Sequence, residues 1–190
     1  DRLVFTTREI AELTQSSISS ATQGLKRLEQ KKILAKVQTG IWALTNDKRF
    51  SSFDIIPFLN QSHQCYLSFI SALHLYGIIS QIPQIITVAS MAHTKNISTP
   101  VGTYLIHQLE PSFFVGFDWH KSGNFLIATP EKALVDCLYI SSRKKNKYSS
   151  FPELEFPNNF SKGRAKKWVE YIRDYKLKKS VLDKLGKILN

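Results

Sequence analysis

The first fifty residues switch between strand-like and helix-like spacing of their hydrophobic positions. A short apolar run at 3–5 predicts a strand. Thr6 and Glu9 then match a capping box, in which two side chains satisfy free backbone N–H groups at a helix start. The short helix that follows is expected to turn Ile10 and Leu13 inward.

A second helix follows the polar turn 14–17, which is expected to supply its own capping Ser. It extends to about Lys31, and its inward positions recur at intervals of three and four residues. Those inward positions are Ile18, Ala21, Leu25 and Leu28. Two strands, 33–38 and 41–44, complete this part of the chain as a hairpin.

The stretch from 55 to 94 contains no Asp, Glu, Lys or Arg. It predicts a helix with Ser68 at its N-cap and Gly77 just past its end, because apolar residues between them keep helical spacing. The β-branched run 85–88 after Pro83 predicts a buried strand. Polar residues interrupt the stretch throughout, so a membrane span is not expected.

The rest of the chain predicts further strands and three helices. A polar loop is expected at 91–100, and strands are expected at 102–109, 112–117 and 125–128. Thr129 caps the next helix, whose first position is Pro130 and whose first turn carries Glu131. A solvated basic run at 143–147 precedes two helices, which begin after Ser161 and Ser180 and bury Ala165, Trp168, Val169, Ile172, Val181, Leu182, Leu185 and Ile188.

The order of these elements predicts an α+β protein of two parts. Helix, turn, helix and hairpin in residues 1–50 is the order of a winged helix-turn-helix domain, and segments 7–13, 17–21, 25–29 and 33–34 resemble bacterial transcriptional regulators of that fold. Residues 51–190 are expected to form a mixed α/β domain, with a small, mostly antiparallel sheet and helices. Its C-terminal segment, 141–190, is expected to be helical.

Charge is distributed unevenly over the chain, whose formal net charge is +11. Residues 1–50 hold nine basic and five acidic groups, residues 51–140 hold three and five, and residues 141–190 hold fourteen and five. Two basic ends around a neutral middle favour an anionic partner, and nucleic acid is the first candidate. An anionic membrane surface and a merely solvated tail are the alternatives.

The second helix and the hairpin supply the candidate DNA-binding residues. The second helix of such a domain enters the major groove, where Gln can read an adenine edge and small polar residues allow close approach, while Lys and Arg suit phosphate. The candidates are Ser16, Ser17, Ser19, Ser20, Gln23, Lys26, Arg27, Lys36 and Thr39. A winged helix used only for protein contact is the alternative, and it is disfavoured because the exposed face is polar and basic.

The C-terminal helices offer a second candidate basic surface. Its residues are Arg164, Lys166, Lys167, Lys178 and Lys179. Such a surface would face phosphate or RNA, but a helical hairpin with an ordinary solvated face explains the same pattern equally well.

Two motifs of the neutral middle resemble a known family. They are Tyr66, Ser68, Ser71, Leu73 and Gly77, followed by the strand after Pro83, and then the run Thr129 to Asp136. Together with the N-terminal elements they resemble the AbiEi family, the antitoxins of type IV toxin–antitoxin systems, over roughly residues 5 to 140. Members often carry His directly before the motif glycine, where this chain has Tyr76, with His74 two places earlier.

The resemblance implies a repressor that binds its own promoter, at repeat sites on double-stranded DNA, and counteracts a co-encoded nucleotidyltransferase-like toxin. Direct contact with that toxin is not implied. A monomer or weak dimer is expected. The alternative is a basic protein- or RNA-interaction module without operator-specific repression.

Signs of catalysis are weak. Gly-rich phosphate loops, metal-ligand Cys/His spacing and nucleophile elbows do not occur, and the five histidines are scattered. No catalytic residue, cofactor or metal is therefore expected, and the protein is interpreted as a non-enzyme. Cys65 and Cys137 lie in apolar contexts typical of buried free thiols, which together with the absence of a visible signal peptide favours a reducing cytoplasm and no membrane partner.

Overall fold

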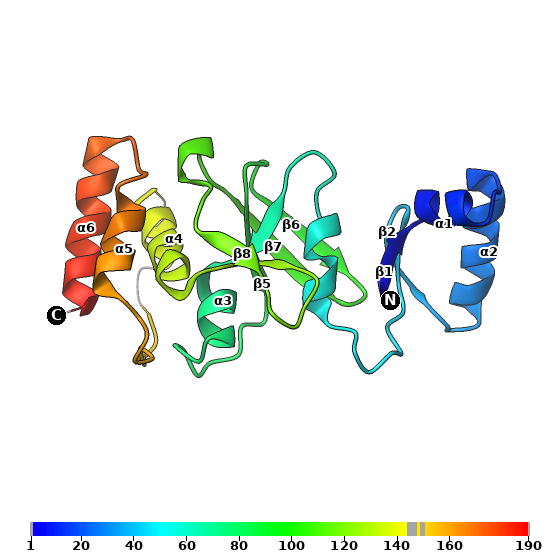
Figure 1. The fold of residues 1–190 in the computed structure, drawn as a ribbon, viewed down its shortest axis with the longest axis horizontal. Coiled ribbons are helices and arrows are strands. Elements are labelled where there is room, and N and C mark those ends of the chain that lie inside the picture. The colour runs from blue at the N-terminus through cyan, green and yellow to red at the C-terminus, as the bar shows by residue number, and fades with distance from the viewer. Residues whose placement is uncertain (1, 144–147, 149–150, 190) are drawn as a thin grey trace.

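The computed structural model describes residues 2–143, 148 and 151–189. The predicted α+β class is confirmed, with two separate sheets and helices around them. Figure 1 shows an elongated molecule, in which the first helices and strands lie at one end and helices α5 and α6 at the other.

The N-terminal unit, defined here as residues 2–44, contains the predicted helices and strands. Its three-stranded sheet is antiparallel in the order β1-β3-β2. The elements are β1 (Val4–Thr6), α1 (Thr7–Leu13), α2 (Ile18–Gln30), β2 (Ala35–Gln38) and β3 (Ile41–Ala43).

Both helix starts in this unit are capped as the sequence predicts. The Thr6 backbone N–H donates to Glu9 Oε2 over 2.7 Å, and the Glu9 N–H donates to Thr6 Oγ1 over 3.2 Å. The bond from the Thr6 backbone lowers the pKa of the Glu9 carboxyl. Ser17 Oγ accepts from the Ser20 N–H over 3.1 Å and so fixes where α2 begins.

The predicted inward faces of these two helices are partly wrong. Leu13 is 81% exposed, Ile18 53% and Leu28 38%, whereas Ala21 and Leu25 are buried as expected. Helix α1 has only seven residues, so its last residue extends beyond the surface that α2 covers. In α2 only the central residues of the predicted apolar face, Ala21 and Leu25, are buried, and the two at its ends, Ile18 and Leu28, remain exposed to solvent.

The N-terminal sheet is covered on both faces. On one face, Trp42 packs in a small cluster with Leu25 of α2 and Leu34. On the other face, Val4, Val37, Ile41 and Ala43 join the large core of the chain. That core includes Ile55, Ile56 and Leu59, in and directly after the short 3-10 helix η1 (Ser52–Phe58). Figure 1 places η1, drawn in cyan, between the two sheets.

The second sheet has six strands in the order β6-β7-β5-β4-β9-β8. Strand β4 pairs in parallel with β9, and β5 with β7, while the other three pairings are antiparallel. The sheet is therefore mixed. Its strands are β4 (Cys65–Leu67), β5 (Ile86–Ser90), β6 (Lys95–Thr99), β7 (Gly102–Gln108), β8 (Phe117–Trp119) and β9 (Leu126–Ala128).

Two predicted segments of this sheet are wrong. The segment 91–100, expected to be a loop, contains the edge strand β6. The alternation of apolar and polar residues that marks a strand is missing there, because most residues of β6 are polar. The expected strand 112–117 begins instead as the 3-10 helix η2 (Pro111–Phe113), since Pro111 occupies the first helical position. The true strand, β8, starts only at its last residue.

Helix α4 (Pro130–Arg143) is the most deeply buried helix of the described chain, and every residue from 131 to 141 is buried. It packs between α3 (Phe69–Leu75) and the C-terminal pair α5 (Lys162–Val169) and α6 (Tyr175–Leu189). Helix α6 begins at Tyr175, ahead of the start predicted after Ser180.

The C-terminal interior agrees with prediction in part. Ala165, Val169, Ile172, Val181 and Leu185 are buried. Trp168, Leu182 and Ile188 are only half-buried against the core.

The basic run expected at 143–147 lies, apart from Arg143, outside the described residues. Of the helices in the described ranges, none combines the length and the apolarity that spanning a bilayer takes.

Candidate nucleic-acid interface

The outward face of α2 carries a continuous row of polar and basic side chains. Ser19, Gln23, Lys26 and Arg27 follow one another at intervals of four, three and one residues, and all four are exposed. No carboxylate of the described chain pairs with Lys26 or Arg27. Their charges are therefore available to an external anion.

The three other serines at the start of α2 are engaged with one another or with the turn. Ser17 Oγ donates to Ser20 Oγ over 3.0 Å, in addition to capping the helix. Ser16 Oγ lies 2.8 Å from Thr14 Oγ1. These bonds hold the turn rigid, and they leave Ser19 as the serine hydroxyl best placed to bind a ligand.

The hairpin holds its two candidate residues differently. Lys36 is half-buried and its Nζ lies 6.0 Å from the centre of the Trp42 ring. The Trp42 indole N–H donates to Thr7 Oγ1 over 2.8 Å, which ties β3 to the start of α1. Thr39 is exposed at the turn, where Gly40 takes a positive φ of 75°. The turn is thus held at a fixed position beside α1.

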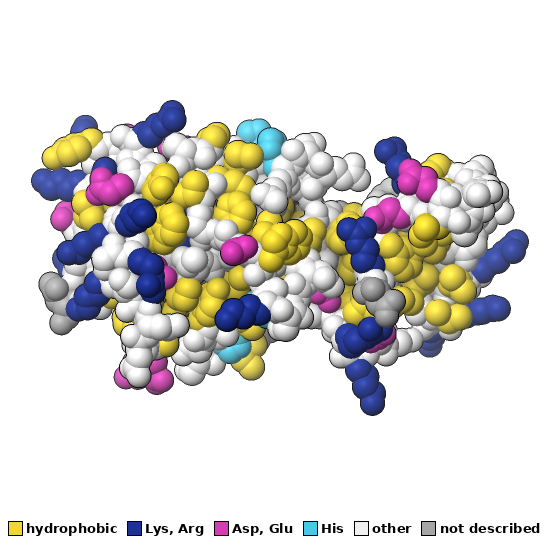
Figure 2. All heavy atoms as spheres, viewed as in Figure 1, with side chains coloured by type: hydrophobic (Ala, Val, Ile, Leu, Met, Phe, Trp, Pro, Cys, Tyr) yellow, Lys and Arg dark blue, Asp and Glu magenta, His cyan; other side chains and the backbone are white. Residues whose placement is uncertain are grey.

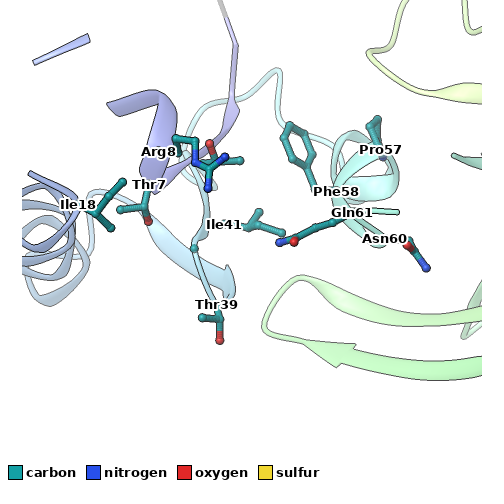
Figure 3. Close-up of a pocket in the computed structure, with 11 residues that line it drawn as sticks. Thr7, Arg8, Ile18, Thr39, Ile41, Pro57, Phe58, Asn60 and Gln61 are labelled. Atoms are coloured by element: carbon teal, nitrogen blue, oxygen red, sulfur yellow. The ribbon is translucent and has the colours of Figure 1, made fainter. Parts of the chain in front are cut away.

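A groove lies between the N-terminal unit and the segment that contains and follows η1. It is a cavity of about 520 Å³ lined by Arg8, Ile18 and Thr39 on one side and by Phe58 and Gln61 on the other. Figure 3 shows the Arg8 and Gln61 side chains reaching toward the space between the two parts. Arg8 is not among the residues predicted from the sequence, which shows its place in the first turn of α1 but not its nearness to the hairpin turn.

The second candidate basic surface divides into engaged and free cations. Arg164 binds the buried carboxylate of Glu131, and Lys178 Nζ lies 2.7 Å from Glu170 Oε2. Lys166, Lys167 and Lys179 are exposed and pair with no described acidic residue. Figure 2 shows Lys and Arg gathered over the α5–α6 end and over the N-terminal unit, with few between them.

The two sequence motifs of the middle region meet in a buried polar cluster formed by Tyr66, Ser68, Lys132 and Asp136, each fully or almost fully buried. Lys132 Nζ donates to Asp136 Oδ1, and also to Tyr66 Oη over 3.2 Å. Asp136 Oδ2 accepts from Ser68 Oγ over 2.6 Å and from Tyr66 Oη over 3.1 Å. Ser68, predicted as an N-cap, makes no side-chain cap bond.

This cluster joins elements rather than facing a ligand. Burial lowers the pKa of the Lys132 ammonium and raises the pKa of the Asp136 carboxyl, while their mutual attraction opposes both shifts. The Lys132 ammonium also lies 3.8 Å from the Phe113 ring centre. Because all four polar side chains are shielded from solvent, the cluster fastens α4 to β4 and offers no surface to a substrate.

Two further groups of side chains are the potential metal ligands and the thiols. In the part of the chain that the structure describes, no three His, Cys, Asp or Glu side chains come together as a metal site. Cys65 and Cys137 are both buried and free. Comparison of the sequence with models of known protein families, and with curated proteins, gives no match.

Proposed function

We propose that the protein is a sequence-specific DNA-binding repressor that acts as the antitoxin of a type IV toxin–antitoxin system. In this proposal residues 1–50 are a winged helix-turn-helix domain, α2 is its recognition helix, and the β2–β3 hairpin is its wing. Operator DNA, at repeat sites in the protein's own promoter, is the ligand. Residues 51–190 counteract a nucleotidyltransferase-like toxin.

The observation that supports the DNA-binding part is the outward face of α2. A helix enters the major groove with an exposed polar face, and Ser19 and Gln23 lie where short side chains and an amide can reach base edges. Lys26 and Arg27 lie further along the same face, without carboxylate partners in the described chain, and suit phosphate. The same helix turns few apolar groups outward along this row, which disfavours a protein partner there.

The groove beside the hairpin extends the proposed contact. Arg8 lines it together with Thr39 of the hairpin turn and Ile18, the first residue of α2. We add Arg8 to the proposed DNA-binding residues as a phosphate contact.

The antitoxin part of the proposal rests on the resemblance of the middle motifs to the AbiEi family and on the charge distribution. Residues 51–140 carry only three basic groups, and one of them, Lys132, is buried. So neutral a region offers little to a phosphate backbone and suits a protein target better.

Operator binding by single variants tests the repressor part. Gln23→Ala should cost about 1–3 kcal/mol at one base position and leave scrambled DNA unaffected. Lys26→Ala should weaken all duplexes alike and reduce the salt slope by about one unit. Lys48→Ala, which removes an exposed charge outside α2 and the hairpin, is the matched control. Equal binding of operator and scrambled duplex at physiological salt contradicts the proposal.

A combined variant tests whether the two roles are separate. Replacing Gln23, Lys26 and Arg27 by Ala alters only exposed side chains, so the fold should be retained. This variant is expected to lose promoter repression in a reporter assay and still to protect cells from the cognate toxin. Loss of protection by the folded variant would mean that neutralisation itself needs DNA binding.

A further inference from the structure

The corner between α5 and α6 combines exposed aromatic rings with unpaired positive charge. Tyr171 is 40% exposed and Tyr175 is 77% exposed. Residues 161–189 contain ten basic and three acidic groups. We propose that this corner is a binding face for single-stranded nucleic acid, on which bases stack against the two tyrosines and lysines hold the backbone.

One ion pair brings the parts of this face together. Lys178 of α6 reaches back to Glu170, the residue directly before Tyr171, with 2.7 Å between Nζ and Oε2. Tyr175 lies three residues before Lys178 and therefore on the same side of α6. Tyr171 and Tyr175 thus flank the same contact, at the end of α5 and the start of α6.

Free cations lie close to the two tyrosines along the chain. Lys179 follows Tyr175 by four residues and so shares its side of α6. Lys167 lies in the last turn of α5, four residues before Tyr171, which stands in the turn after that helix. Both ammonium groups are exposed, as is Arg173 in the connecting turn, and none of the three has a carboxylate partner in the described ranges. Basic groups with aromatic rings between them are the usual means of binding unpaired bases together with their backbone.

The exposed hydrophobic side chains of this corner are of a type that favours nucleic acid over a membrane or a protein as the partner. In the described part of 151–189, the large hydrophobic side chains that are strongly exposed are Tyr171 and Tyr175 alone. A membrane-binding face needs Leu, Phe or Trp to insert below the headgroups, and exposed aliphatic residues would be expected for a protein partner. A base can stack on tyrosine without an aliphatic neighbour.

Single strands fit this face better than duplex DNA. Stacking requires bases that are not already stacked and paired within a double helix. The corner also lies at the opposite end of the molecule from α2, so it is separate from the duplex site proposed above (Figure 1). The inference does not depend on α2 binding an operator.

The test uses the full chain and end-labelled single strands of about 12 nucleotides of mixed sequence, as RNA and as DNA, followed by fluorescence anisotropy. Replacing Tyr171 and Tyr175 together by Leu should weaken single-strand binding roughly tenfold or more. Replacing both by Phe should retain it, because the ring is kept. Trp119→Leu, at an exposed aromatic on β8, should change nothing.

The charge part is tested by salt dependence. Lys167→Gln with Lys179→Gln should reduce the slope of log affinity against log salt by about 0.7 for each phosphate that is no longer neutralised. Circular dichroism checks that every variant is folded. Comparing the affinities for RNA and DNA strands shows which of the two nucleic acids the face prefers, since only RNA offers the 2′-hydroxyl.

Three results would overturn the proposal. They are unchanged binding by the Leu double variant, equal weakening by the Phe and Leu double variants, and binding of anionic vesicles without binding of single strands. The Gln23→Ala variant separates this test from that of the repressor, since it should weaken operator binding and leave single-strand binding unchanged.

Discussion

Arg164 on α5 donates two hydrogen bonds to one carboxylate oxygen of Glu131 on α4, over 3.0 Å from Nε and 2.7 Å from Nη2. The Ser161 backbone N–H donates to the same oxygen over 2.9 Å. Glu131 is 2% exposed, so these donors are what satisfies its buried charge. Arg164, a candidate for the second basic surface, is therefore already engaged in joining two helices.

Removing this guanidinium should destabilise the protein without altering nucleic-acid binding directly. Arg164→Ala leaves a buried carboxylate with one donor, at an expected cost of about 1–3 kcal/mol, because Arg164 itself is partly in solvent. Chemical denaturation measures the change. Lys166→Ala, two residues away and exposed, should stay within about 0.5 kcal/mol. Equal stability of the two variants would contradict the role given to Arg164.

The buried pair of Lys132 and Asp136 should be strongly coupled in stability. Lys132→Met leaves the Asp136 carboxylate buried without a countercharge and should cost about 3–5 kcal/mol. Adding Asp136→Asn should restore about 1–3 kcal/mol, because a neutral amide needs no countercharge and its oxygen still accepts from Ser68 and Tyr66. Denaturation midpoints of both variants and of Lys121→Met, at an exposed lysine, test this. A double variant less stable than Lys132→Met alone would show that the pair is not coupled.

Arg8 should contribute to duplex binding through charge rather than sequence. If a phosphate lies in the groove beside Thr39, Arg8→Ala weakens operator and scrambled duplex by the same factor and lowers the salt slope by about one unit. Arg2→Ala is the control, since Arg2 already pairs with Glu9. Anisotropy over a salt series gives both slopes, and a change confined to the operator would assign Arg8 a base contact instead.

Stability should fall in alkaline solution because of buried thiols. Burial raises the pKa of Cys65 and of Cys137 above the ordinary value of 9.0. Above pH 9.0 the unfolded chain releases thiol protons that the folded chain retains. The free energy of unfolding is therefore unaffected by these thiols below that pH and decreases as the pH rises above it.

Urea midpoints between about pH 7 and about pH 10, in reducing buffer, check this expectation. Cys137→Ala removes one of the two thiols and should make the alkaline fall shallower, whatever its effect at neutral pH. An identical pH profile for the variant would exclude Cys137 as a source.

Local signals predicted the parts of the fold whose cause is local. Thr6, Ser17 and Ser161 each cap a helix through a bond to a residue three positions later, and the sequence displays such pairs directly. Gly77 ends α3 with a positive φ of 70°, as its position after an apolar helical run predicts.

Distant partners account for what sequence could not predict. Ser68 has the position of an N-cap, yet its hydroxyl donates to Asp136, 68 residues later. Strand β6 exists because β7 pairs with it, and its own residues show little strand periodicity. For the same reason the sequence pattern predicts Arg164 as a surface cation, because its partner Glu131 belongs to another helix.

The double covering of the N-terminal sheet constrains how this chain can be recombined. Val37 and Ile41 share a buried cluster with Ile55 and Ile56 of η1, so a crossover at residue 50 would leave apolar surface bare on both fragments. A DNA-reading unit exchanged between relatives would have to bring residues 51–59 with it. The residues of η1 in that unit would also have to pack against the six-stranded sheet of the recipient. Substitutions on the two sides of this junction are therefore expected to be inherited together.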